Sequence, residues 1–555
     1  MKKQSVQQFL VVFSVVAFSG LVPAAHPQTV PNLPGVPPIS TASQTQFQQQ
    51  THFLTFLGSF IPESAASATA YYNAIDPPTT ACPAGCKRNF TQWLKNAGFI
   101  SDEGQWHQYG PQDIRTGQPA GVYGDNIINA DSHVIVLNAS DLGFVRNQFI
   151  RCKPSCSAPN PIIYTYLENY PVAPFAGSGF PTGTGYPTQA EAAAAINSAI
   201  TRPLGVLGGD GVSPCPAGSA CIERIADVAF EWAPPADGSS PSSRFGQQYA
   251  FVFSHTGPAA GGITETIAAS PAQVGQHIPD FSNPNGPFLT INPGDPFPPN
   301  LDGQGFKQHP GVCLICHGGK PTSLVGGVFP RKGKIDGFRF LPLDNRNLLF
   351  TSATGTEATS QVNQEAQIKK YNQAVLKTVA AMPQRDDQGT IRPPHIAEVI
   401  RGWYATCLNG SPNYCDDPSM SGATQNGNFI PKGWREAPNG GTAPAGSESL
   451  YLSTVATSCR TCHFNRELSL DFGTVANFNA ESDLLQLALL PECQANNPDP
   501  NKRPMPLALL TYERLWQGQP VAPQPLSDGT LLMNTILQLK NHFGFTATSY
   551  CASHP

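Results

Sequence analysis

The stretch SESLYLSTVATSCRTCH, residues 447–463, decides how the C-terminal part of this chain is expected to fold. Apolar residues recur at helical spacing in its first part, which predicts a helix over Ser447–Ser458. The helix leads directly into the pattern Cys-x-x-Cys-His, which runs from Cys459 to His463. The same pattern occurs a second time upstream, as CLICH over residues 313–317. Chance rarely produces this spacing twice in one chain, so the two copies indicate a common chemistry.

The Cys-x-x-Cys-His pattern suits covalent attachment of haem. Its two thiols lie one helical turn apart and can add to the two vinyl groups of the porphyrin, while the histidine is held beneath the iron as a ligand. Zinc is the alternative, but a zinc site needs four ligands, and the other cysteines occur mostly in close pairs elsewhere. We therefore expect two covalently bound haem c groups. The attachment residues are Cys313 and Cys316 for the first haem and Cys459 and Cys462 for the second, with His317 and His463 as iron ligands.

The sixth position of each iron is expected to be filled by a methionine. Met382 and Met505 are each followed by a proline, which restricts the chain and holds the thioether in place. Met505 also lies between the second motif and a predicted helix over Leu507–Trp516, so we expect it to ligate the second haem rather than to fill a core. Met382 is the corresponding expectation for the first haem. The alternatives for the first haem are an open iron, His277, His309 or His395.

The N-terminus has the pattern of an export signal. Two lysines near the start precede the apolar stretch Phe9–Phe18, and small residues then allow cleavage after Ala24 or Ala25. We expect residues 1–25 to be a signal peptide, with an uncleaved anchor as the alternative, and residues 26–50 to be a flexible leader rich in Pro, Gln and Thr. No later stretch is apolar for long enough to cross a bilayer. The expected location is therefore the periplasm, or else the cell surface or the exterior, without stable membrane insertion.

The cysteine content supports an oxidising location. The chain has 14 cysteines, and most of those outside the two motifs fall in close pairs that we expect to be disulfide bonds. A metal half-site is the alternative for each pair, but the residues between the paired cysteines are mostly not ligands. The expected pairs are Cys82/Cys86, Cys152/Cys156, Cys215/Cys221 and Cys407/Cys415, with Cys493 and Cys551 remaining.

The charge balance bears on possible partners. The chain of 555 residues has 38 acidic and 33 basic residues and a formal net charge of −5, without a run of basic residues. This balance argues against nucleic-acid binding, which requires a basic surface. The expected partners are a redox protein or a small-molecule electron donor or acceptor.

We expect three folded parts after the N-terminal segments. Residues 51–295 predict an α+β domain, because strands rich in Val and aromatic residues occur together with short helices. Residues 296–425 and 440–555 are expected to be mainly α and rich in loops, with one motif in each. The predicted strands are His133–Leu137, Pro161–Tyr166 and Gln248–Ser254. The further predicted helices are Phe90–Ala97, Ala190–Ile200, Val362–Ala381, His395–Tyr404 and Leu531–Asn541.

At its two motifs the chain resembles the c-type cytochromes. Residues 440–555 are similar to a class I cytochrome c domain in their order of helix, motif, loop, Met-Pro and helix, and residues 296–425 resemble this pattern more loosely. The resemblance implies cytochrome c-like haem domains. The residues that carry it are Cys459, Cys462, His463 and Met505 in the second part and Cys313, Cys316, His317 and Met382 in the first.

Segments outside the motifs extend the resemblance. HVIVLNASDLGFVRNQFIRC (133–152), GQQYAFVFSHTG (246–257) and LDGQGFKQHPGVCLICHGG (301–319) resemble exported bacterial dihaem proteins, which implies no particular substrate. Dihaem peroxidases also have two such motifs, but they consist of two adjacent cytochrome domains, and residues 51–295 depart from that plan. The expected function is electron transfer between redox partners through two haems. The alternative is a dihaem oxidase or peroxidase with an open iron at the first haem.

Overall fold

The structure, a computed structural model, describes the parts of the chain that carry both motifs. Its longer described stretches are 65–83, 85–100, 129–138, 142–170, 189–200, 226–233, 247–254, 309–318, 338–380, 394–406, 419–464 and 470–482. Its shorter ones are 267, 277–278, 289–290, 292, 295–296, 384–385, 391–392, 412–415, 539 and 542–544. Residues 1–50, Met382, Met505 and the predicted helix Leu507–Trp516 lie outside the described residues, as does most of Leu531–Asn541.

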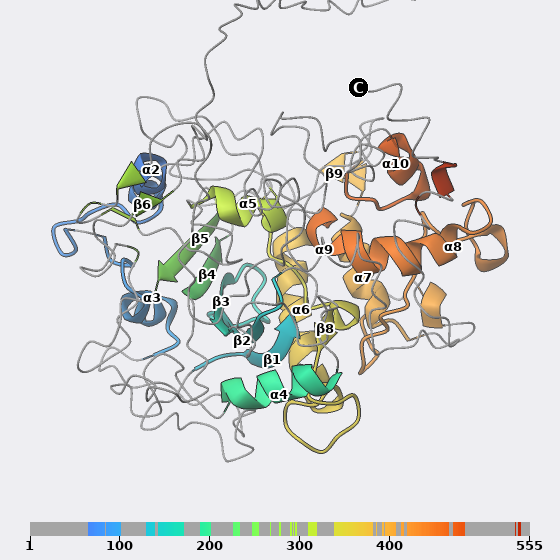
Figure 1. Cartoon of the computed structure of the whole chain (residues 1–555), viewed down its shortest axis with the longest axis horizontal. Helices are drawn as coiled ribbons and strands as arrows, with labels where there is room; N and C mark the ends of the chain where they lie inside the picture. The colour runs from blue at the N-terminus through green and yellow to red at the C-terminus, as the bar shows by residue number, and fades with distance from the viewer. Residues whose placement is uncertain are drawn as a thin grey trace, which may run out of the picture. The chain divides into compact units, whose positions relative to one another are not determined.

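A six-stranded antiparallel sheet is the central element (Figure 1). Strands β1 to β5 are neighbours in chain order, so each one turns back beside the strand before it, and β8 pairs with the outer edge of β1. The strands are β1 (Ser132–Asn138), β2 (Val145–Lys153), β3 (Ile162–Tyr170), β4 (Ala226–Ala233), β5 (Gln247–Ser254) and β8 (Leu348–Leu349).

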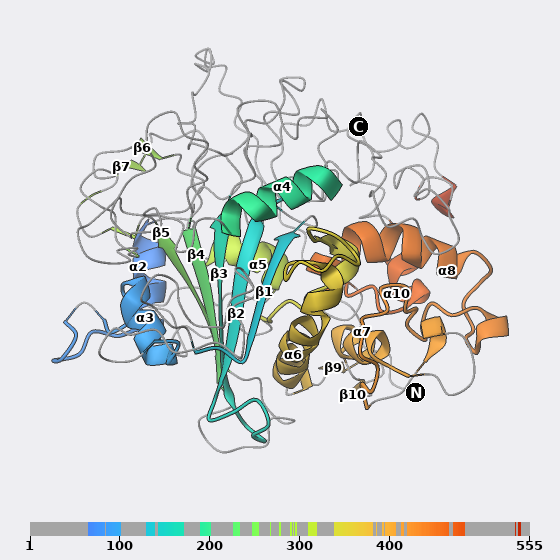
Figure 2. The same ribbon diagram turned by 90° about the horizontal axis from the view of Figure 1, so that it is seen from below.

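Both faces of this sheet are covered, since nearly every described side chain of β1 to β4 is buried. Successive residues of a strand point to opposite faces. Helix α3 (Phe90–Ala97) contributes Trp93, whose ring lies 6.1 Å from that of Tyr166 on β3. Helix α4 (Gln189–Ile200) crosses the sheet near β1 and β2 (Figure 2). A single large apolar core results, which joins the sheet to the first motif.

Helix α6 (Gln361–Ala380) is fastened to β1 by the side chain of Gln364. The Gln364 Nε2 donates to the carbonyl of Ile135 at 2.9 Å, and its Oε1 accepts from the amide of Ile135 at 2.7 Å. Ser132 Oγ donates to the Gln367 carbonyl at 2.7 Å. Strand β8 is short and does not reach this part of β1. The side-chain amide of Gln364 therefore satisfies the backbone groups of β1 that β8 leaves unpaired. Residues from after position 338 therefore complete a sheet whose other strands come from before position 255.

The remaining described elements are mostly helical. A second, smaller apolar core lies near the second motif and includes Trp434, Tyr451 and Phe478. The helices are α2 (Ala65–Ile75), α5 (Gly311–His317), α7 (His395–Trp403), α8 (Ser447–Leu450), the π-helix η6 (Tyr451–Cys459), α9 (Arg460–His463) and α10 (Val475–Ala480). Short elements are η3 (Asn345–Asn347), η4 (Pro412–Tyr414), η5 (Ala437–Asn439), β6 (His277–Ile278), β7 (Leu289–Thr290), β9 (Gln384–Arg385) and β10 (Ile391–Arg392).

Disulfide bonds join Cys82 to Cys86 and Cys152 to Cys156, which are the first two pairs expected from the sequence. Cys415 is also disulfide-bonded, and Cys407, its expected partner, lies outside the described residues. The expected pair Cys215/Cys221 and residues Cys493 and Cys551 lie outside the described residues. In the described part of the chain, no helix is both long and apolar enough to span a membrane.

Candidate functional site

The first motif lies entirely within the short helix α5, which begins directly after Pro310. Proline fits at this position, because the start of a helix leaves its N–H groups without helical partners. Cys313 and Cys316 are buried on this helix. Gly318 ends the helix with a φ of +68°, a backbone conformation that favours glycine. The motif is therefore presented on a single compact turn.

The second motif ends a continuous helical segment formed by α8, η6 and α9. The predicted helix over Ser447–Ser458 is present, but it is π-helical from Tyr451 onward. Within the π-helical part, Thr457 Oγ1 donates to the carbonyl of Leu452 at 2.9 Å. π-helical turns are rare in proteins and frequently occur at functional sites. This one delivers Cys459 and Cys462 to the position where the two motifs meet.

The two motifs lie against each other, although they are far apart in the sequence. The Sγ atoms of Cys316 and Cys462 are 3.8 Å apart, and helices α5 and α9 are in contact. The four motif cysteines take part in no disulfide bond. The fold therefore brings two thiols from separate Cys-x-x-Cys-His motifs into van der Waals contact.

Each motif histidine has its ring fixed in the same way. His317 Nδ1 donates to the carbonyl of Arg339 at 2.7 Å, and His463 Nδ1 donates to the carbonyl of Leu470 at 2.5 Å. This tautomer places the proton on Nδ1 and the lone pair on Nε2, which is the arrangement of a metal-ligating histidine. The His463 ring also stacks on Phe472 at 4.0 Å between ring centroids. Both imidazoles are thus oriented by backbone and aromatic contacts.

Residues 338–347, called here the linking segment, connect the two motifs. At one end, the Arg339 carbonyl accepts the hydrogen bond from His317. The guanidinium of the same residue donates to the carbonyl of Phe464, which follows the second motif, at 3.2 Å. Arg346 Nη2 donates to the Leu452 carbonyl at 2.7 Å. One short segment therefore contacts the first iron-ligand candidate and the helix that carries the second motif.

A buried ion pair anchors this segment within the second motif itself. Arg460, the residue after Cys459, donates from Nε and Nη2 to the two carboxylate oxygens of Asp344, each at 2.8 Å. The Arg460 side chain is fully buried and lies 5.3 Å from the ring of Trp403. Burial alone would lower the pKa of Arg460, but Asp344 and Tyr451 outweigh it and raise that pKa. Arg460 therefore remains charged, and its ion pair with Asp344 fixes α9 against the linking segment.

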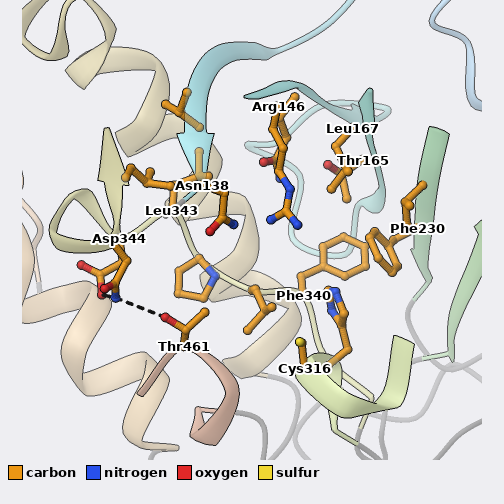
Figure 3. Close-up of a pocket in the computed structure, with 18 of the residues that line it drawn as sticks. Asn138, Arg146, Thr165, Leu167, Phe230, Cys316, Phe340, Leu343, Asp344 and Thr461 are labelled. Carbon is orange, nitrogen blue, oxygen red and sulfur yellow. Dashed lines mark hydrogen bonds between the residues drawn. The ribbon is translucent and has the colours of Figure 1, made fainter. Parts of the chain in front are cut away.

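A cleft of about 100 Å³, partly open to solvent, borders both motifs (Figure 3). Figure 3 shows Cys316 and Thr461 on one side and Arg146, Thr165 and Leu167 on the other. Side chains of β1 to β4 form one wall, and α5, α9, the linking segment, β8 and α6 contribute to the rest. The apolar lining includes Val136, Val228, Phe230, Phe340, Leu343 and Phe464.

Two of the alternative histidine ligands are buried. The pKa of each is lowered to about 3, chiefly because burial disfavours the charged ring. His309 Nε2 donates to the carbonyl of Ala250 at 2.8 Å, which gives it a structural partner. Among the described residues, neither ring nitrogen of His395 has a hydrogen-bond partner, and its ring lies 5.3 Å from that of Phe464. His277 begins β6, and its side chain lies outside what the structure describes.

The motif residues are not arranged as a zinc site. A zinc ion needs ligand atoms about 2.0–2.3 Å from one centre, so those atoms must lie close together. In the described part of the chain, one group of possible ligands gathers this closely, namely Asp131, Cys152 and Cys156, and the two cysteines are disulfide-bonded. The motif thiols and imidazoles form no such group in that part.

Sequence reasoning identified the motif cysteines and histidines but not the residues that bring them together. Asp344, Arg339 and Arg146 belong to no motif, and no local spacing relates them to α5 or α9. The sheet wall of the cleft likewise follows from strand order rather than from a sequence signature. Comparison of the chain with protein-family models, curated proteins and solved structures gave no match. The functional interpretation therefore depends on the residues and geometry of this chain.

Proposed function

We propose that this protein is an exported dihaem c-type cytochrome that carries electrons between redox partners. Cys313 and Cys316 attach the first haem and Cys459 and Cys462 the second, with His317 and His463 as iron ligands. The observation that carries the proposal is the 3.8 Å contact between the Sγ atoms of Cys316 and Cys462.

This contact matters because a thioether sulfur is separated from its porphyrin ring by a single carbon atom. Two such sulfurs in contact place the attachment edges of two porphyrins close to each other. When bound, haem supplies reversible one-electron chemistry at its iron. Electron transfer slows steeply with distance, so the chain's contribution is to hold the two attachment points together.

The donor atoms fit haem. None of the four motif cysteines is in a disulfide bond, so each can form a thioether, and each histidine presents the lone pair of Nε2. The apolar lining of the cleft beside α5 suits the body of a porphyrin. The disulfide bonds in the described part of the chain suit an oxidising compartment, which supports export to the periplasm or beyond.

For the sixth ligands, we retain Met505 at the second haem and Met382 at the first as proposals from the sequence. Both lie outside the described residues. Methionine opposite histidine tends to raise the reduction potential of a c-type haem, which suits an electron carrier.

The decisive experiment is to purify the exported protein from a host that matures c-type cytochromes, and to count covalent haem by the alkaline pyridine spectrum. We expect two haems per chain. The double variants C313A/C316A and C459A/C462A should each retain one. The variant C82A/C86A, which removes a disulfide bond outside the motifs, is the matched control and should keep both haems. Wild-type protein without covalent haem would disprove the proposal.

A second candidate function, a dihaem oxidase or peroxidase, is favoured by one observation. Among the described residues that line the cleft, His317 is the one histidine, and no methionine or lysine is present. A first haem bound there would have an open iron unless Met382 reaches it. Carbon monoxide binding separates the two cases: if Met382 is the ligand, M382A creates a new binding haem, and if the iron is open, wild type already binds and M382A changes little.

A further inference from the structure

The cleft has a polar half that the attachment of haem does not explain. Asn138 lies on β1, Arg146 and Gln148 on β2, and Thr165 and Asn169 on β3. Arg146 and Gln148 are two positions apart on one strand, as alternate residues facing the same side of a sheet must be. Porphyrin faces are apolar, so a row of amide, hydroxyl and guanidinium groups is suited to a polar ligand instead.

Charge in the cleft is positive on its sheet side. Figure 3 shows Arg146 pointing into the pocket, and among the described lining residues it is the one lysine or arginine. Its Nε donates to Asn169 Oδ1 over a long 3.4 Å. The one acidic residue among the described lining residues, Asp344, has both carboxylate oxygens bonded to Arg460. A negative group entering the cleft would therefore meet a guanidinium and a carboxylate that is already neutralised.

The polar side chains are held in place by their own contacts. Gln148 Nε2 donates to the hydroxyl of Tyr371 at 2.5 Å, and Thr165 Oγ1 donates to the Phe149 carbonyl at 2.7 Å. Burial raises the pKa of Tyr371 to about 12, so the phenol keeps its proton at neutral pH. Strand β2 is paired on both sides, by β1 and β3. Polar groups fixed on a rigid sheet can bind a small ligand without first being ordered.

We propose that the polar half of the cleft, centred on Arg146, binds a small anion beside the first haem. This inference rests on the second candidate function, because it needs a haem attached to α5 whose iron is open to azide and carbon monoxide. The ligand class is a compact anion such as nitrite, for which azide is the probe. Arg146 supplies the charge, and Asn138, Gln148 and Tyr371 are the neighbouring polar groups of the same half.

The propionate groups of the first haem are also anions, and their carboxylates could bind Arg146 in place of an external anion. The two cases differ in what Arg146 controls. If Arg146 binds an external anion, its removal weakens the binding of that anion and leaves the binding of a neutral ligand unaffected. If it binds a propionate, its removal changes the reduction potential of the first haem and leaves azide affinity unchanged.

The test uses the purified dihaem protein and the variant R146Q, with K370Q as a charge-matched control at an exposed position of α6. Azide and carbon monoxide are titrated by absorbance, and the reduction potentials of both haems are measured in parallel. We expect azide to bind wild type and K370Q alike, and to bind R146Q at least about tenfold more weakly, as loss of a charge-assisted hydrogen bond predicts. Carbon monoxide affinity should be the same in all three proteins.

Two results would overturn the inference while the haem count leaves the proposed function intact. One is a wild-type protein with two haems that shows no azide binding. The other is an R146Q variant with unchanged azide affinity, whether or not the potential of its first haem shifts. Absence of covalent haem would instead refute the proposed function itself. Thermal unfolding of R146Q followed by circular dichroism shows whether the variant folds, and R146K, which keeps the charge, should recover part of the azide affinity.

Discussion

At the scale of single residues, the most consequential side chain outside the haem-binding residues is Asp344. It neutralises Arg460, which is fully buried in the middle of the second motif. A buried ion pair adds little net stability as a pair, but removal of one partner leaves an uncompensated charge in the interior. Asp344 therefore keeps the Cys459–His463 turn in the position where it meets α5.

Replacement of Asp344 by asparagine should lower the free energy of unfolding by about 3–5 kcal/mol, the cost of breaking a buried ion pair. Urea unfolding of the haem-loaded protein, followed by circular dichroism, measures this loss. Glu357→Gln is the matched control, since Glu357 is exposed and surface substitutions change stability by less than about 0.5 kcal/mol. Equal stability of D344N and E357Q would show that the pair does not fix the second motif.

The buried histidines make a separate prediction about pH. An unfolded histidine takes up a proton below its ordinary pKa of 6.5, whereas His395 in the folded protein stays neutral until about pH 3. The unfolded state then binds more protons, so stability falls as the pH decreases from about 6.5 toward 3, by up to about 1.4 kcal/mol per pH unit for each such histidine. Burial raises the pKa of Asp471 to about 6, so the folded state keeps a proton that the unfolded state has already lost. Asp471 therefore contributes stability at low pH that is lost as the pH rises toward 6.

His395→Leu isolates this effect, because Asp471 and His309 are present in both proteins. The variant should lose less stability than wild type between pH 6.5 and pH 4.5, by chemical unfolding at each pH. It should also keep an unchanged haem spectrum, since we propose Met382 and Met505 as the sixth ligands. A change to a high-spin spectrum in H395L would instead identify His395 as an iron ligand.

At the scale of elements, the sequence predicts helices better than strands. Phe90–Ala97 and His395–Tyr404 match α3 and α7 closely, because apolar residues recur at helical spacing, and Gly98 ends α3 while Pro394 precedes α7. Strands β1, β3 and β5 are likewise predicted. Strands β2 and β4 are not, since VRNQFIRCK and ADVAFEWA place charged or amide residues inside a covered sheet. Arg146 and Gln148 of β2 line the cleft, whereas Glu231 of β4 pairs with Lys87, and no local pattern encodes either environment.

The contact between α5 and α9 can be tested without haem. In protein expressed without haem attachment, the thiols of Cys316 and Cys462 should form a disulfide bond on mild oxidation, because their Sγ atoms are already 3.8 Å apart. Mass spectrometry of a non-reducing digest identifies the pair, and circular dichroism shows that the sample is folded. Cys313 paired with Cys316, or Cys459 with Cys462, in folded protein would contradict the geometry of the two helices.

At the scale of the whole molecule, the domain boundary expected between residues 295 and 296 has the weakest physical support in the sequence. Composition changes there, yet β8 and α6 come from beyond it and pack on β1. The large apolar core contains residues from both sides, including Trp93 and Phe464. Such long-range contacts leave no trace in periodicity or composition, so the sequence predicts the parts and not their attachment.

These packing contacts predict that the sheet and the first-motif region unfold together. Gln364→Ala removes two hydrogen bonds to the buried backbone of Ile135 and should lower stability by about 1–3 kcal/mol for each unsatisfied group. Lys370→Ala, on the exposed side of the same helix, should change little. In urea, the haem absorbance and the far-ultraviolet circular dichroism of Q364A should shift to a lower midpoint together. If only the circular dichroism shifted and the haem transition stayed in place, the sheet would be an independent domain, and the cleft would lie between two separately folding units.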